Sequence, residues 1–586
     1  MRMTWADHLH ARLAGPMHRR LSRIADPERP ISGQADRGRA LLAGRFRLAG
    51  ARVDAAGSVW EPDAPTAAFE AERQGFGWLD DLAAYGTASA RQAARGWTRE
   101  WLNRFGNGHG PGWTLALASD RLSRLLDHAG FLAGGEGGLA PGQLERAFAR
   151  HQRFAQRRLG TLPGGAEGAA ICTRLILAGV SLEDGAGLVA RAQVALERLC
   201  PELIDLSGAV SDRAPETLAK VFTDLAFAAS GLEETGTAVG PEHRRALAAA
   251  APVLRALRHA DGHLARFHGG GAGDVARIDA ALAAAAARHA AAPEIAMGYG
   301  RLSRGRSSVI VDCAAPPAGG KGGRTAHAST LAFEMTVGRR PFIVSSGPGC
   351  SFGPDWCAAG RATAAHSTLV VAEASSARFA AEVAGPDVLT EGPRVVEADL
   401  GTDRPAARLV AAHSGYAGSH GLIHVRRLDL SLDGGALRGE DLLSAVTEAE
   451  KRRFVQARAA AGRQSGAGPG HGLPFAIRFH LHPDVDAELD PALGVVRLML
   501  GNGDGWTFRH ASACTIGLDP GVYLEKTRAE PAAARQIVLS GLAMHHATSV
   551  KWSLTRDGTA PAFLREVPRI GVEADHEPTS ALEDPR

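Results

Sequence analysis

The segment "GYGRLSRGRSSVIVDC", residues 298–313, marks a change of periodicity along the chain. Its second half, "RSSVIVDC", is rich in β-branched residues and is bounded by turn residues, which predicts a strand. Before about residue 290 apolar residues recur three and four positions apart, whereas after about residue 295 they recur every second position. The segment therefore separates a helical half of the chain from a sheet half.

The helical half consists of amphipathic segments joined by loops rich in glycine and proline. In "SARQAARGWTREWLNRF", for example, Ala90, Ala94, Trp97 and Trp101 share one helical face. Similar helices in series, with short connections, predict stacked helical hairpins that form a solenoid or toroid. The predicted helices cover residues 87–105, 113–132, 142–158, 168–179, 185–200, 214–230, 242–258 and 274–289.

The sheet half contains many short segments of alternating polarity, separated by turn residues. "SLDGGALRG" is a plausible hairpin turn between two of them. Many antiparallel strands with almost no helix predict a β-sandwich. The expected fold class is multidomain α + β, an incomplete α/α toroid followed by a large antiparallel β-sandwich. The expected division is an N-terminal segment (1–70), the toroid (71–292), the sandwich (295–570) and a disordered acidic tail (571–586).

Composition excludes several classes of protein. The net charge of +3 is too small to indicate nucleic-acid binding. The sequence has no run of 18 consecutive apolar residues, so a transmembrane segment is not expected. Its first residues lack the apolar core of a secretory signal. Six cysteines without a CxxC pair favour reduced thiols, although Cys350 and Cys357 are close enough to bridge a loop. Nothing in the sequence indicates an oligomeric state.

Five of the 66 basic residues are lysine, so arginine dominates the positive charge. Its planar guanidinium binds carboxylates and sulfates through two parallel hydrogen bonds, which would suit an acidic polymer. A GC-rich genome would produce the same bias, because it favours arginine and alanine codons. The sequence leaves both explanations open, with the genomic one favoured.

Several blocks of the sheet half resemble one known family. They are "AHASTLAFEMTVGRRPFIVSSGPG" (326–349), "RATAAHSTLVV" (361–371), "FHLHPDV" (479–485) and "NGDGWTF" (502–508), which follow residues 298–317 in order. Their order and spacing are similar to the C-terminal domain of the heparinase II/III family of polysaccharide lyases. In the helical half, "GFGWLDDL" (75–82) and "RLILAGVSLEDG" (174–185) look like toroid helices of that family.

The resemblance implies β-elimination on a polysaccharide that contains uronic acid. Such an enzyme neutralises the C6 carboxylate, removes the C5 proton and protonates the leaving oxygen. The resemblance places His327 and His366 in the cleft as acid/base or metal-binding groups. Arg361 is the candidate for holding the carboxylate, Tyr299 for a phenolic base with a lowered pKa, and His263 or His268 for a replacement proton shuttle.

The resemblance also implies one divalent metal, such as zinc, in a structural or substrate-orienting role. Its ligands in the family are two histidines and an aspartate. Here His327 and His366 are present, but Ser345 stands at the aspartate position, so the candidate third ligand is His424, or else His480 or His482. The alternative is that each is an ordinary core histidine; alternation predicts that His327 shares a strand face with Phe333.

The helical half departs from the family pattern at the toroid residues. A block like DGGHxxRSPxYH corresponds here to "LSGAVSDRAPETLAK", in which Val210 replaces the histidine and Thr217 the tyrosine. Two functions therefore remain open: a lyase, or a catalytically silent polysaccharide-binding protein of envelope glycan synthesis or export. The family implies the cell envelope or periplasm, whereas the lack of a visible signal peptide leaves the cytoplasm open.

Overall fold

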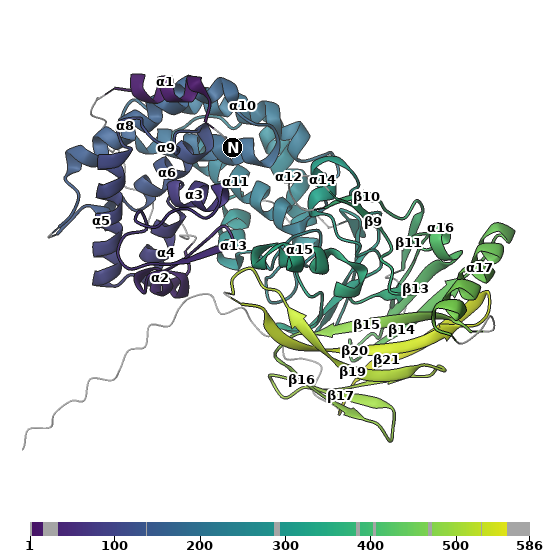
Figure 1. Ribbon diagram of the computed structural model, residues 1–586. Helices are drawn as coiled ribbons and strands as arrows, with labels where there is room; N and C mark the ends of the chain where they lie inside the picture. The colour runs from purple at the N-terminus through teal and green to yellow at the C-terminus, as the bar shows by residue number, and fades with distance from the viewer. Residues whose placement is uncertain are drawn as a thin grey trace, which may run out of the picture.

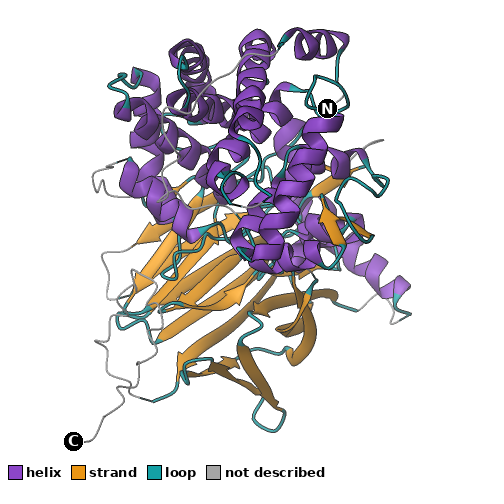
Figure 2. Cartoon of the chain, turned by 90° about the vertical axis from the view of Figure 1, so that its left-hand side faces the viewer, coloured by secondary structure: helices purple, strands orange, loops and turns teal. Residues whose placement is uncertain are grey.

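The computed structural model describes residues 3–15, 33–135, 137–285, 293–381, 387–401, 406–466, 471–528 and 530–558. A helical domain lies against one end of a two-sheet domain (Figure 1; Figure 2). The change from helix to strand falls between Ala284, the last residue of α13, and Ile295, the first residue of β3. The toroid-plus-sandwich fold class predicted from the sequence is confirmed.

The helices of the first domain begin at residues that satisfy their free backbone N–H groups. The hydroxyls of Thr66, Thr87 and Thr114 accept hydrogen bonds from backbone amides in the first turns of α3, α5 and α6. The helices are α1 Trp5–Leu13, α2 Ala35–Leu42, α3 Ala67–Gln74, α4 Gly77–Tyr85, α5 Ala88–Arg104, α6 Leu115–Asp127, α7 Ala129–Leu132, α8 Pro141–Arg158, α9 Gly165–Ser181, α10 Ala186–Leu203, α11 Pro215–Glu234, α12 Pro241–Ala256 and α13 Val275–Ala284.

A small antiparallel hairpin accompanies these helices, formed by β1 Arg45–Leu48 and β2 Ala51–Asp54. The core of the domain is rich in aromatic residues. The guanidinium of Arg121 is fully buried and lies 4.3 Å from the ring centre of Trp101 and 5.2 Å from that of Trp113. Burial lowers the pKa of Arg121 to about 9.

The second domain is built from two antiparallel sheets. One has eight strands in the order β11 Val396–Gly401, β12 Ala407–His413, β13 Ile423–Leu430, β14 Ala436–Ser444, β21 Ala547–Arg556, β18 Gly505–His510, β17 Val495–Leu500 and β16 Val485–Asp490. The other runs β19 Thr515–Tyr523, β20 Ala532–Ala543, β15 Leu473–Leu481, β7 Arg340–Val344, β6 Phe333–Val337, β5 Ser307–Asp312, β4 Tyr299–Arg304 and β3 Ile295–Ala296, with β8 Leu369–Val371 also paired to β15. A separate pair is β9 Arg378–Ala380 with β10 Val388–Glu391.

Apolar side chains from both sheets fill the space between them. The rings of Phe333 on β6 and Trp552 on β21 stack with centres 5.9 Å apart, and Phe479 on β15 meets Trp552 edge-on. Alternating burial along β12 and β13 gives each strand one core face, which is the pattern of a sandwich. The hairpin turn expected in "SLDGGALRG" connects β13 and β14.

The expectation of almost no helix in the sheet half is wrong. This half contains α17 Glu448–Gln464, together with the short helices α14 Gly320–Thr325, α15 Pro354–Arg361 and α16 Ala417–His420. The expectation of reduced thiols fails at one pair, because Cys350 and Cys357 form a disulfide, whereas the other four cysteines are free. His327 lies in the loop before β6 rather than on a strand. The predicted acidic tail lies outside the described residues.

No helix in the described ranges is long and apolar enough to cross a membrane.

Candidate functional site

Three histidines from separate segments meet where the helical domain contacts the sandwich. His268 lies in the loop after α12, His327 before β6, and His366 before β8. Nδ1 of His327 is 3.2 Å from Nε2 of His366, and Nδ1 of His366 is 3.0 Å from the Ser345 hydroxyl. The backbone N–H of Gly269 donates to Nε2 of His327 at 2.9 Å. The expected convergence of His327 and His366 is therefore present.

These contacts assign the tautomers of the pair. Because Nε2 of His327 accepts from a backbone N–H, its Nδ1 carries the proton and donates to His366. Nδ1 of His366 then carries the second proton and donates to Ser345. Both side chains are at most 1% exposed. Burial lowers the pKa of His366 to about 4 and holds that of His327 well below its ordinary value, so both rings are neutral near pH 7.

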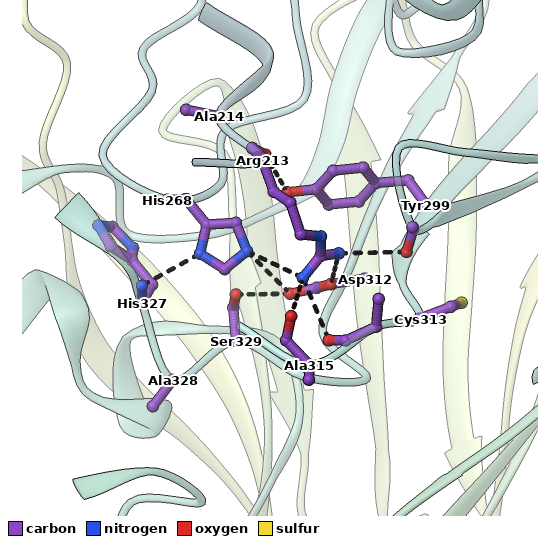
Figure 3. A network of polar contacts seen from close by, with 12 residues as sticks. Arg213, Ala214, His268, Tyr299, Asp312, Cys313, Ala315, His327, Ala328 and Ser329 are labelled. Carbon is purple, nitrogen blue, oxygen red and sulfur yellow. Dashed lines mark hydrogen bonds and ion pairs between the residues drawn. The ribbon is translucent and has the colours of Figure 1, made fainter. Parts of the chain in front are cut away.

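His268 connects this pair to a buried charge pair (Figure 3). Its Nδ1 accepts from the backbone N–H of His327, and its Nε2 lies 3.4 Å from an Nη of Arg213 and 3.6 Å from Oδ2 of Asp312. Burial is the main cause that lowers the pKa of His268 to about 3. Asp312 forms an ion pair of 2.6 Å with Arg213, which also donates to the backbone carbonyls of four residues, Met297, Gly298, Ala314 and Ala315.

Tyr299 does not have the surroundings that the predicted phenolic base requires. Its hydroxyl donates to the backbone carbonyl of Arg213 at 2.7 Å, and its side chain is 1% exposed. Burial raises its pKa well above the ordinary value, although the Arg213 guanidinium opposes this shift. A base needs the opposite shift, so Tyr299 is a structural contact between the two domains.

Arg361 does not face a substrate either. Its Nε donates to the carbonyl of Ala326 at 2.8 Å and one Nη to that of Gly323 at 2.6 Å, and the other Nη contacts the carbonyl of Asp387. The guanidinium also lies over the ring of Phe379. All of these partners belong to the protein, so Arg361 holds surrounding loops together, and the expected carboxylate-binding role does not fit.

The expected metal centre lacks a third ligand. His424 does not join His327 and His366, because its Nε2 contacts Asp441 at 2.7 Å and its Nδ1 contacts His413 at 3.3 Å. Across the described part of the chain, no three or more His, Cys, Asp or Glu side chains are grouped to hold a metal ion. A structural zinc site normally has four protein ligands, and a catalytic one three, so these residues do not fit zinc.

His263, the remaining candidate, is half exposed and lies 3.1 Å from Asp261. It lines an open cavity of about 900 Å³ between the loop after α12 and the sandwich. Neither His327 nor His366 lines this cavity. The charged and aromatic residues around it are His259, Asp261, His263, Arg266, Glu334, Arg339, Arg340, His482, Asp484, Tyr523, Glu525 and Arg528.

Two arginines at the cavity have no carboxylate partner in the described structure. Arg340 begins β7, and Arg528 follows β19; both are exposed. Arg266, in contrast, is buried and shared between Glu334 and Glu525, with its guanidinium 4.8 Å from the ring centre of Tyr523. The cavity thus combines free positive charge with an aromatic side chain.

Sequence reasoning missed most of this cavity. Its lining comes from four separate segments. The sequence singled out His263 as a candidate, and the blocks 326–349 and 479–485 carried the family resemblance, but neither block indicated a cavity. Runs such as "GRRPF" around Arg340 carry no motif that distinguishes a cavity arginine from a surface one.

Comparisons with known proteins agree with this architecture. Residues 287–553 match the family model described as heparinase II/III-like, C-terminal. The chain is also 30% identical over 554 residues to FtsZ-localized protein C of Caulobacter vibrioides. The aligned region covers 91% of this chain and 90% of that protein. The chain belongs to the heparinase II/III family.

Solved structures of this heparinase II/III-like type extend the match over both domains. Heparinase III has a TM-score of 0.64 and 11% identity, covering 94% of this chain and 89% of that one. The heparan sulfate lyase HepC of Pedobacter heparinus has a TM-score of 0.53 and 13% identity, covering 94% and 87%. At such identities the likeness concerns the fold alone.

The two positions that depart from the heparinase II/III pattern have structural roles here. Val210 is buried in the core of the helical domain. The Thr217 hydroxyl donates to Oδ2 of Asp212 at 2.8 Å in the first turn of α11. Neither side chain supplies an ionisable group to the histidine cluster. Arg213, between them, instead closes the cluster from the helical side.

Proposed function

We propose that this chain binds an acidic polysaccharide in the cavity between its two domains and does not cleave it. The observation that carries the proposal is the sealing of the histidine cluster. His327 and His366 are neutral, almost completely buried and bonded to protein atoms. A proton transfer to sugar needs a group within hydrogen-bond reach of the substrate, and neither ring provides one.

The cavity provides the groups that recognition of an acidic sugar requires. Arg340 and Arg528 offer guanidinium groups without carboxylate partners among the described residues, and such groups bind carboxylate or sulfate through paired hydrogen bonds. Tyr523 and His482, whose rings lie 5.0 Å apart, add aromatic surface to the wall. Carbohydrate ligands combine apolar ring faces with polar edges, so this mixture supports glycan binding.

The experiment separates binding from cleavage. Purified full-length protein is incubated with a panel of uronic-acid polymers, and ultraviolet absorbance and affinity electrophoresis are recorded together. We expect retarded migration on at least one acidic polymer with no rise in absorbance, since only β-elimination creates a conjugated double bond. A rise that His366→Ala abolishes would establish a lyase and overturn the proposal.

A matched pair of variants tests the position of the site. Arg340→Ala combined with Arg528→Ala should weaken retardation about tenfold or more, as expected for the loss of two charged hydrogen-bonding groups. Arg438→Ala removes an exposed arginine from β14, outside the cavity, and should leave retardation unchanged. Equal effects of the two changes would show that binding is a general effect of positive charge.

A second candidate function is favoured by the 30% identity to FtsZ-localized protein C, which extends over nine-tenths of both chains. We propose that this chain also gathers where FtsZ assembles. A fluorescent fusion expressed from the native locus should form a band that coincides with labelled FtsZ. A uniform distribution in dividing cells would contradict this candidate without affecting the glycan-binding proposal.

A further inference from the structure

The cavity between the two domains carries an exposed negative charge as well as exposed positive ones. Asp484, which directly precedes β16, lines the cavity together with Arg340 and Arg528. Its side chain is 68% exposed. The nearest side chain that could carry a positive charge, among the residues the structure describes, is His482, whose Nδ1 lies 3.6 Å from Oδ2 of Asp484.

The ring of His482 does not neutralise this carboxylate. Its Nδ1 accepts a hydrogen bond from the backbone N–H of Asp484 at 3.2 Å, so that nitrogen has no proton to donate to the carboxylate. Burial is the main cause that lowers the pKa of His482 to about 4, so the ring is neutral near pH 7. The negative charge of Asp484 is therefore uncompensated.

The other carboxylates that line the cavity are engaged by neighbouring protein groups. Glu334 and Glu525 share the guanidinium of Arg266. The carboxylate of Asp261 lies 3.1 Å from Nδ1 of His263 and accepts from the backbone N–H of that residue at 2.9 Å. One carboxylate of the cavity thus remains free for a ligand, beside two free guanidinium groups.

This combination does not suit a ligand that is only anionic. Asp484 and Arg528 both act electrostatically on the ring of His482, yet they form no ion pair with each other in the described structure. A polymer with carboxylates alone would be attracted by the guanidinium groups and repelled by the carboxylate, because like charges at a binding surface oppose association. A polymer that also carries ammonium groups would satisfy both.

We propose that the polysaccharide bound in this cavity is zwitterionic, with free amino groups on some of its sugars in addition to its carboxylates, and that Asp484 selects for those amino groups. The inference rests on the proposed glycan-binding function and specifies its ligand. A sugar ammonium group donates charge-assisted hydrogen bonds to Asp484, while sugar carboxylates pair with Arg340 and Arg528. Asp484 is then a specificity-determining residue of the cavity.

Affinity electrophoresis of the full-length protein tests the inference, with mobility compared with that in a polymer-free gel. Hyaluronan and N-deacetylated hyaluronan of the same chain length have the same carboxylates and differ in free amino groups, and alginate has carboxylates alone. The N-deacetylated form should retard the protein about twofold to fivefold more strongly than native hyaluronan, the range of an exposed ion pair. Retardation by alginate with no preference for the N-deacetylated form would overturn this inference and leave the proposed function standing. No retardation by any of the three polymers would overturn both.

A point variant separates a role in specificity from a role in folding. Asp484→Asn should weaken retardation by N-deacetylated hyaluronan about twofold to fivefold, and should leave retardation by native hyaluronan equal or slightly stronger, because it removes an attraction and a repulsion together. Asp399→Asn is the matched control, since Asp399 is exposed on β11, at the edge of the eight-stranded sheet opposite β16, and it should change neither value. Equal weakening on both polymers, or an undiminished preference for the N-deacetylated form, would overturn the assignment of Asp484.

Discussion

The guanidinium of Arg213, just before α11, lies 2.6 Å from the carboxylate of Asp312 at the end of β5. One residue belongs to the helical domain and the other to the sandwich. Asp312 is fully buried, and the arginine donates in addition to four backbone carbonyls around it. Burial alone would raise the pKa of Asp312, but the charge of Arg213, the nearby His268 and the hydrogen bonds from Arg213 and Ser329 together lower it. The pair thus joins the domains as ions.

Removing one partner of this pair should destabilise the chain strongly. Arg213→Ala leaves the Asp312 carboxylate buried without its main partner, which typically costs about 3–5 kcal/mol. Calorimetry should show a clearly lower melting temperature. Lys451→Ala removes an exposed pair with Glu448 and should change stability by about 0.5 kcal/mol or less. Similar melting temperatures for the two variants would contradict the role of Arg213.

Stability should fall as the pH drops below the ordinary pKa of histidine. Unfolded histidine binds a proton near pH 6.5, whereas folded His366 and His268 bind one only near pH 4 and pH 3. Between these values the unfolded state holds more protons, so the free energy of unfolding decreases as the pH falls. Urea midpoints measured from about pH 7.5 to about pH 4.5 should decline, and less steeply for His366→Asn. A flat profile would mean that the rings are not buried as neutral bases.

Gly439 on β14 should not tolerate a side chain. A Cβ atom there would lie 2.1 Å from the ring of Trp552, its buried cross-strand neighbour. Gly439→Ala should therefore destabilise the sandwich by about 1–3 kcal/mol, as overpacking does. Gly96→Ala, in the middle of α5 with open space around it, should instead stabilise by about 0.5–1 kcal/mol. Urea unfolding of both variants checks the opposite signs.

Purified protein should contain little zinc, because the histidine pair lacks a third ligand. Elemental analysis should give less than about 0.2 equivalents of zinc. Added zinc should leave the melting temperature unchanged, since an ion stabilises only the state that binds it. One equivalent of tightly held zinc, lost in His327→Ala, would contradict this expectation.

Much of the fold could be predicted because burial leaves a periodic pattern. Most of the expected helices have a counterpart with similar limits, such as residues 87–105 for α5 and 242–258 for α12, whereas residues 113–132 form two helices, α6 and α7. Helix α17 was not predicted because it has almost no apolar stripe: only Phe454 and Gly462 are buried among its 17 residues. Strand β19 likewise lacks a clear alternation of buried and exposed residues, since most of its residues are at least partly exposed.

The site was harder to predict because it depends on contacts between distant segments. The matching blocks indicated correctly that His327 and His366 converge. Nothing in those blocks shows that the loop containing His268 and Gly269 packs against His327 from the helical side. Whether a histidine is catalytic or sealed is decided by the third segment that packs over it, and that packing has no local sequence pattern.

Arg213 also limits how a polymer can enter. Its guanidinium is bonded to the sandwich through Asp312 and backbone carbonyls, so hinge opening of the two domains would break all of these contacts together and hydrate a buried ion pair. A sugar chain bound as proposed would therefore enter the cavity from the side while the domains stay fixed. Loading and release would then depend on surface loops, and their rates should be insensitive to a crosslink that joins the two domains.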